Sequence, residues 1–189
     1  MVATVTIQDD TGGSDNSPGA TASVTNLRYK EADNNTQDLV NPVTIPTAGT
    51  KNSFWKHSFL EVTTAGGFAQ IDNVNLWVDS FDWTGTTLYI DDGDAGLLHN
   101  LTTPSEAGYD IADGLNDLDT HSHITSKVNH GTTHIASGSA KSINISEAGS
   151  VINIVNETTD YWVTNLDLTT SAVAGLQTAK TENVEYDEI

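Results

Sequence analysis

Apolar and polar residues alternate in several short stretches of this chain. Val5 and Ile7 alternate with threonines in residues 4–7, and Val74, Leu76 and Val78 stand at every second position of 73–79. A period of two is typical of a strand that buries one face. Further strands are predicted at residues 27–30, 55–63, 87–90, 142–145, 151–155, 161–169 and 181–186.

Turn-forming residues separate these stretches, and no segment has a helical period long enough to predict a helix. Short runs that combine glycine with Asp or Ala occur at 10–13, 65–67 and 92–93, where they favour tight turns. Many short strands between such turns predict an all-β fold. We expect one domain over residues 1–189, an antiparallel β-sandwich of the Ig-like or jelly-roll-like kind.

Two segments depart from this pattern. Residues 8–20 are rich in Gly, Ser, Asp and Asn and predict a surface loop, whereas residues 91–139 are longer and rich in Gly, Asp, His and Thr. A structureless loop of that length is uncommon in a compact domain. We therefore expect 91–139 to be an excursion, or a small subdomain, that faces outward or toward a neighbour and adds nothing to the core.

The composition is strongly acidic. The 189 residues include 26 Asp and Glu against 7 Lys and Arg, a formal net charge of -19. Binding to nucleic acid or anionic lipid needs basic residues that displace counterions, so we expect neither a nucleic-acid nor a membrane partner. Such a surface suits a halophilic source, in which salt screens the charge. An ordinary acidic secreted or surface protein is the alternative.

The sequence shows no cysteine, no membrane-spanning stretch and no signal-peptide pattern. The chain has no cysteine, so no disulfide is expected. No apolar run approaches the length of a membrane span. The first residues lack the pattern of a signal peptide, which predicts a protein made and assembled in the cytoplasm.

Two groups of polar residues in the excursion resemble cation ligands. A His-x-His pair on a strand places both imidazoles on one face, and two further histidines could complete a shell. A run of aspartates around a glycine resembles part of a calcium loop, without its full pattern. The candidates are His121, His123, His130, His134, Asp91, Asp92 and Asp94. A polar loop without metal is the alternative, so a structural calcium or other cation is the single cofactor considered.

The tryptophans divide into two kinds. Trp77 stands on the polar side of 73–79, and Trp83 lies near the tip of an acidic turn. Large aromatic groups on an outer face are either covered by the chain itself or used at an interface. Trp77 and Trp83 are therefore the interface candidates, whereas Trp55 and Trp162 are expected in the core.

No catalytic motif stands out. The sequence contains no Gly-x-Ser-x-Gly nucleophile elbow and no phosphate-binding GxxxxGK[ST] loop. A non-enzymatic role is expected.

Three stretches carry a family resemblance. The first is residues 26–30, followed by Asn34-Asn35 and residues 41–46, and the second is residues 53–56 leading to residues 71–77. The third is residues 162–168, followed by Ala174-Gly175 and the terminal Tyr186-Asp187-Glu188. Together these stretches resemble virion structural proteins of prokaryotic tailed viruses. The resemblance covers about half of the chain and skips the His-rich excursion.

The resemblance implies a β-sandwich displayed on a virion that assembles in the host cytoplasm. The role implied is a capsid decoration, turret or minor capsid subunit, whose partners are copies of itself and other virion proteins such as the major capsid protein. With the acidity, it implies a virus of a halophilic archaeon or a marine bacterium. The alternatives are a tail or fibre component and a carbohydrate-binding adhesive β-sandwich.

Overall fold

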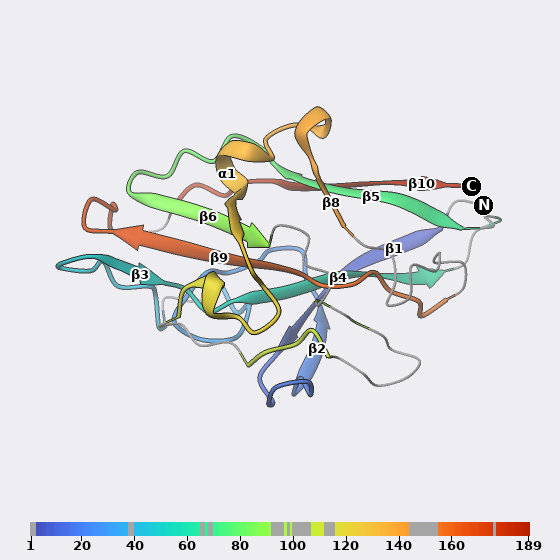
Figure 1. Cartoon of the computed structure of the whole chain (residues 1–189), viewed down its shortest axis with the longest axis horizontal. Coiled ribbons are helices and arrows are strands. Elements are labelled where there is room, and N and C mark those ends of the chain that lie inside the picture. Colours follow the sequence, from blue (N-terminus) through green and yellow to red (C-terminus); the bar gives the residue numbers. More distant parts are fainter. Residues whose placement is uncertain are drawn as a thin grey trace.

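Antiparallel strands build two sheets in this protein (Figure 1). The computed structural model describes residues 3–37, 40–64, 67, 70–91, 97, 99, 107–111, 116–143, 155–175 and 177–189. The larger sheet has the order β2-β1-β4-β9-β6-β7, and β3 also pairs with β9. Its strands are β1 (Thr4–Thr11), β2 (Ala20–Ser23), β3 (Thr50–Asn52), β4 (Lys56–Thr64), β6 (Thr86–Asp91), β7 (Lys127–Asn129) and β9 (Trp162–Thr169).

The smaller sheet has the order β10-β5-β8 and lies along the upper part of Figure 1. Its strands are β5 (Ile71–Val78), β8 (Lys141–Ser142) and β10 (Glu182–Glu188). The described helices are short: η1 (Leu118–Thr120), α1 (His130–Thr133) and η2 (Ser137–Ser139). The predicted all-β, antiparallel, sandwich-like class is confirmed. In the described part of the chain, no helix has the length and apolar character needed to cross a membrane.

The core between the sheets follows from the alternation. Val74 and Leu76 of β5 face Leu60 of β4 and Trp162 of β9, all at most 2% exposed. Full burial of side chains of this size stabilises the fold by about 1.5–3 kcal/mol each. Val78, Leu88, Leu166 and Leu168 continue this core toward the other end of the sandwich.

The opposite face of the larger sheet is covered as well, and this overturns the prediction that the excursion adds nothing to the core. Four of the eight buried residues in this second core come from the excursion. They are Leu97, Tyr109, Leu118 and Ile124, which pack on Trp55, Phe59, Tyr161 and Val163. The segment is poor in large apolar residues, but these four all lie buried against the sheet, whereas Ile111 and Ile135 are exposed. Because both of its faces are covered, β9 is buried along almost its whole length.

Most of the predicted strands are present, with some differences. The alternation in 27–30 forms no strand, and Lys30 makes only an isolated bridge with Pro42. The predicted loop 8–20 is shorter, because β1 runs on to Thr11 and β2 begins at Ala20. Of the strands expected at 142–145 and 151–155, residues 144–145 and 151–154 lie outside the described residues.

Candidate functional site

Two consecutive aspartates of β1 each belong to a cluster of buried titratable side chains, one on either face of the larger sheet. Asp9 and Asp10 are each 1% exposed. Neighbouring side chains of a strand point to opposite faces. Asp9 therefore lies on the face of the larger sheet that packs against the smaller sheet, with Ser58 as its cross-strand partner, and Asp10 lies on the face that the excursion covers, opposite His57.

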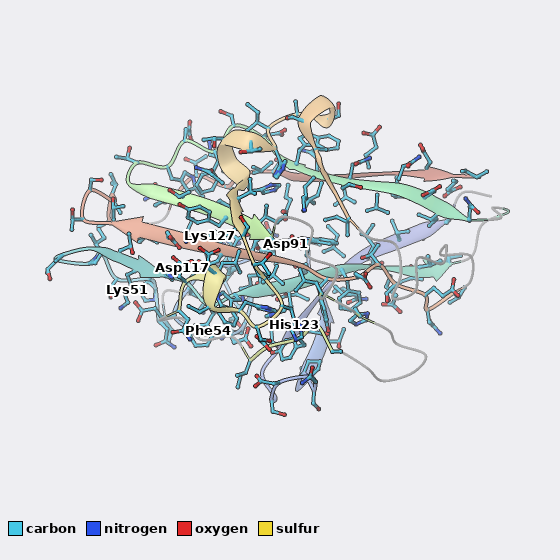
Figure 2. All side chains as sticks on the ribbon, viewed as in Figure 1. Lys51, Phe54, Asp91, Asp117, His123 and Lys127 are labelled. Atoms are coloured by element: carbon cyan, nitrogen blue, oxygen red, sulfur yellow. The ribbon has the colours of Figure 1, made fainter. Side chains whose placement is uncertain are left out.

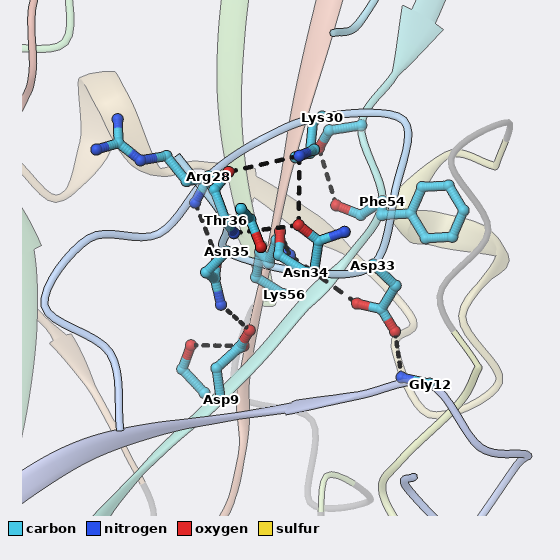
Figure 3. Close-up of polar contacts among 12 residues, drawn as sticks. Asp9, Gly12, Arg28, Lys30, Asp33, Asn34, Asn35, Thr36, Phe54 and Lys56 are labelled. Carbon is cyan, nitrogen blue, oxygen red and sulfur yellow. Dashed lines mark hydrogen bonds and ion pairs between the residues drawn. The ribbon is translucent and has the colours of Figure 1, made fainter. Parts of the chain in front are cut away.

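Asp9 belongs to what we call the aspartate–lysine cluster, Asp9, Asp33 and Lys56 (Figure 3). The Asp9 carboxylate accepts hydrogen bonds from Asn35 Nδ2 at 2.6 Å and from Ser58 Oγ at 3.3 Å. Burial raises the pKa of Asp9 to about 7, against the lowering effect of the Lys56 charge. Asp9 is therefore protonated in a large fraction of molecules near neutral pH.

Lys56 is fully buried in this cluster. Its Nζ atom donates to the Asn34 carbonyl at 3.2 Å and lies 3.9 Å from Asp33 Oδ1. The other oxygen of that carboxyl, Oδ2, accepts the Gly12 N–H at 2.5 Å. Burial lowers the pKa of Lys56 and raises the pKa of Asp33. The charged forms of both groups are thus disfavoured relative to water.

On the other face of the sheet, Asp10 accepts hydrogen bonds from the hydroxyls of Thr21 and Tyr161. His99 Nε2 lies 3.7 Å from Asp10 Oδ2, and His99 Nδ1 lies 2.8 Å from Thr158 Oγ1. The imidazole of His99 stacks on Phe59 with ring centroids 3.8 Å apart. Burial lowers the pKa of His99 to about 4, so this imidazole is neutral at neutral pH.

His57 and His121 form a buried pair beside this group, with their Nε2 atoms 2.9 Å apart. The backbone N–H of His123 donates to His121 Nδ1 at 3.2 Å, which makes Nδ1 an acceptor. The same Nδ1 atom lies 3.6 Å from Asp110 Oδ2. Burial and the neighbouring His121 lower the pKa of His57 well below its ordinary value. The neutral form of the His57 ring is therefore favoured in this pair.

The structure separates the predicted cation ligands. His121 pairs with His57, and His130 pairs with His134 through Nδ1 atoms 3.1 Å apart. Within the described ranges, no group of three or more His, Asp or Glu side chains could hold a metal ion. Asp91 is buried at the end of β6. Asp92 and Asp94 lie outside the described residues.

A salt-bridge group fastens the excursion to the larger sheet (Figure 2). Lys127 of β7 bonds to Asp117 and lies 3.4 Å from Asp167 of β9. Its Nζ atom stands 4.1 Å from the centroid of the Tyr89 ring. Burial raises the pKa of Asp167 to about 6. The group links the excursion to β6 and β9.

The two interface candidates are both half-buried. Trp83 donates its indole N–H to the Thr178 carbonyl at 2.9 Å and packs beside Phe81, with ring centroids 4.9 Å apart. Trp77 stands on the outer side of β5, opposite Asn183 of β10. Trp77 thus presents an aromatic surface on the face of the smaller sheet that points away from the core.

Sequence reasoning missed the aspartate–lysine cluster, although a signal for it was present. Lys56 and Ser58 stand four and two positions before Leu60, on the inward face of β4, and Asp9 continues the inward series of Val5 and Ile7. A lysine and an aspartate in inward positions of neighbouring strands indicate a buried polar cluster.

Comparison with protein-family models, with curated proteins and with solved structures gives no match for this chain.

Proposed function

We propose that this chain is a non-enzymatic structural subunit of a virion, a capsid decoration, turret or minor capsid protein. The observation that carries the proposal is the burial of its chemically capable side chains. Five of the six histidines are buried, as are Asp9, Asp10 and Lys56. They bond to one another and to the backbone, which stabilises a fold but leaves a substrate little to contact.

The segments that resemble virion proteins support the same proposal. They supply most of β5 and β9, the start of β4 and the end of β10. Tyr29 and Val43, from the first of these segments, pack on the end of the sandwich. These elements make up much of both sheets. The excursion, which the resemblance skips, covers the second face of the larger sheet.

The exposed strand edges indicate the kind of contact. β2 is exposed at all four residues, and β10 carries Glu185, Asp187 and Glu188 in exposed positions at the edge of the smaller sheet. Acidic edges discourage indiscriminate strand pairing. They favour a neighbour with basic groups, or contact between copies in salt that screens the charge.

Adhesion to sugars is the second candidate, and it has less support. The indole N–H of Trp83 already donates a hydrogen bond to the Thr178 carbonyl, and part of its ring packs on its own chain. A stacking platform for sugar rings needs a free aromatic face. Trp77 is the better candidate for such a face.

The test is mass spectrometry of particles purified from the virus that carries this gene. We expect peptides of the chain in the particle band of a density gradient, at a constant ratio to the major capsid protein after a high-salt wash. Absence from the particles, together with binding to a glycan array, would favour adhesion instead.

Replacement of the interface candidates tests where the contact lies. Trp77→Ala should reduce incorporation into particles, because a buried aromatic anchor typically contributes about 2 kcal/mol or more to an interface. Trp77→Phe, which keeps the ring, is the matched control and should retain incorporation. Incorporation unchanged in both Trp77→Ala and Trp83→Ala would remove these residues from the interface.

A further inference from the structure

We propose that Lys56 and Asp33 join through an intramolecular amide bond, which ties β4 covalently to the segment between β2 and β3. The two side chains meet in the interior, with Lys56 Nζ 3.9 Å from Asp33 Oδ1. The Lys56 side chain is 0% exposed and that of Asp33 is 11% exposed. Asp33 Oδ1 has no hydrogen-bond partner among the residues that the structure describes.

Among the other lysine–carboxylate pairs of the described residues, Lys127–Asp167 is similarly buried, with side chains 13% and 9% exposed, but its ammonium also bonds to Asp117. The remaining pairs lie nearer to water. The acid side chains in the pairs Lys51–Glu31, Lys127–Asp117 and Lys180–Asp82 are 26%, 40% and 71% exposed. Water solvates such pairs as ions and screens them. Lys56 and Asp33 lack most of that solvent, which is the condition under which an amine and a carboxylic acid can exist side by side in their neutral forms.

The groups around the pair hold it in place for reaction. Asn34 accepts a hydrogen bond from Lys56 Nζ and directly follows Asp33 in the chain, so one short segment positions both partners. Reactions between groups held in this way benefit from a large effective concentration, with reacting atoms about 3–3.5 Å apart in the productive arrangement.

The backbone N–H of Gly12 can stabilise the charge that develops on the Asp33 carboxyl group during the reaction. Its N–H donates to Asp33 Oδ2 at 2.5 Å. A donor on this oxygen polarises the carboxyl carbon and stabilises the negative charge that develops on the oxygen during attack, as an oxyanion hole does. Gly12 has a φ of +65°, a conformation that a side chain would strain, so glycine keeps this N–H pointing at the acid.

Asp9, the third residue of the aspartate–lysine cluster, favours proton transfer from Lys56 to Asp33. Asp9 acts on the charges of both Lys56 and Asp33, and burial raises its pKa to about 7. When Asp9 is neutral, the Lys56 ammonium loses one of the two anions that stabilise it. This effect favours the transfer of a proton from Lys56 to Asp33. It outweighs the loss of repulsion between Asp9 and Asp33, because Lys56 affects the pKa of Asp9 more than Asp33 does.

The reaction balances without any further reagent. The Lys56 ammonium passes one proton to the Asp33 carboxylate, which gives an amine and a carboxylic acid. The amine nitrogen attacks Cγ of Asp33, the bond between Cγ and the hydroxyl oxygen breaks, and a second proton from nitrogen leaves with that hydroxyl as water. One N–C bond forms, one C–O bond breaks and one water molecule is released, with no oxidation or reduction.

The test is the intact mass of the purified, folded chain, denatured just before measurement. We expect a mass lower than that of the unmodified sequence by one water molecule. Trypsin should then fail to cut after Lys56, and residues 31–51 should appear linked to residues 52–127. Lys56→Arg keeps a cation but provides no primary amine, and Asp33→Ala removes the acceptor, so both should restore the full mass.

Lys30→Met is the matched control. Lys30 is also buried, and its Nζ atom lies 3.3 Å from Asn34 Oδ1, so a bond at that site would release ammonia rather than water. The water deficit should persist in this variant. A full, unmodified mass in the folded wild type after incubation at neutral pH would overturn the proposal. So would a deficit that survives Lys56→Arg, because dehydration at an aspartate elsewhere would then explain it.

Discussion

At the scale of single residues, the interior is specified by polar groups at inward strand positions. Asp9 stands in the same inward series as Val5 and Ile7, and Lys56 in that of Leu60. Buried polar groups cost free energy unless each finds a partner, so they tolerate few alternative arrangements. A slip of β1 by one residue would place Gln8 among the apolar side chains of the core. The polar residues therefore help to fix the strand register.

Replacement of Asp9 should change how stability depends on pH. The pKa of Asp9 is about 7 in the folded protein against an ordinary 3.8, so the folded state binds the proton more tightly. The stabilisation is complete below about pH 3.8 and is lost as pH rises toward about 7, by up to about 1.4 kcal/mol per pH unit. Relative to Asp9→Asn, the wild type should therefore lose stability across this window.

Urea unfolding at a series of pH values measures the difference in free energy of unfolding between the wild type and Asp9→Asn. The contributions of the other titrating groups cancel in this difference. Formation of the Lys56–Asp33 amide keeps the sign, because loss of the Lys56 charge raises the pKa of Asp9 further. Asp72→Asn, at a partly exposed position of β5, controls for the removal of one negative charge. Parallel curves for wild type and Asp9→Asn would contradict the assignment of a raised pKa to Asp9.

At the scale of elements, the excursion acts as a third layer. It lies on the larger sheet through a few apolar side chains and is fastened by Lys127 to β6 and β9. The larger sheet is thus enclosed between the smaller sheet and the excursion. Strands enclosed on both faces lose the alternation of exposed and buried positions, which is what β9 shows.

Truncation of the apolar residues of the excursion should destabilise the whole protein. Leu118 is fully buried and Ile124 is 4% exposed in the second core. Each change to alanine should lower the free energy of unfolding by about 2–5 kcal/mol, from lost burial and the cavity that remains. Ile135→Ala is the matched control, since Ile135 is 48% exposed and its loss should change stability by less than about 0.5 kcal/mol. Equal, small effects in a denaturant titration would argue against a third layer.

The strands were predictable from the sequence where one face of the strand is exposed to solvent. Residues 73–79 alternate because β5 has an exposed side, and the period of two predicted that strand nearly to its ends. The excursion was not predictable in the same way, because its four core residues are far apart in the sequence and follow no period. His57–His121 and Lys56–Asp33 likewise join distant segments, so composition and spacing place neither pair.

At the scale of the whole molecule, the charge sets the conditions under which the protein is stable. A net charge of -19 is self-repulsive in dilute buffer. Salt shortens the range of this repulsion, to about 3 Å at molar concentrations. A halophilic source remains a prediction of this composition.

Thermal melts in a salt series test the prediction. The melting temperature should rise between about 0.05 M and about 2 M KCl, because screening removes repulsion from the folded state. Glu185→Lys, at an exposed position of β10, lowers the net negative charge and should reduce the size of the rise. A melting temperature that does not change with salt would count against adaptation to a saline environment.

The position of β4 has a consequence for how the chain is made. β4 pairs with β1 on one side and with β9 on the other, where Lys56 lies opposite Thr164. On a ribosome that adds about 5–20 residues per second, the edge of β4 that pairs with β9 stays unpaired for several seconds, until β9 has been synthesised. An unpaired edge next to apolar side chains invites pairing between neighbouring nascent chains. Mutual repulsion among such acidic chains would hold them apart during that interval, so the charge would protect the unfinished protein as well as the finished one.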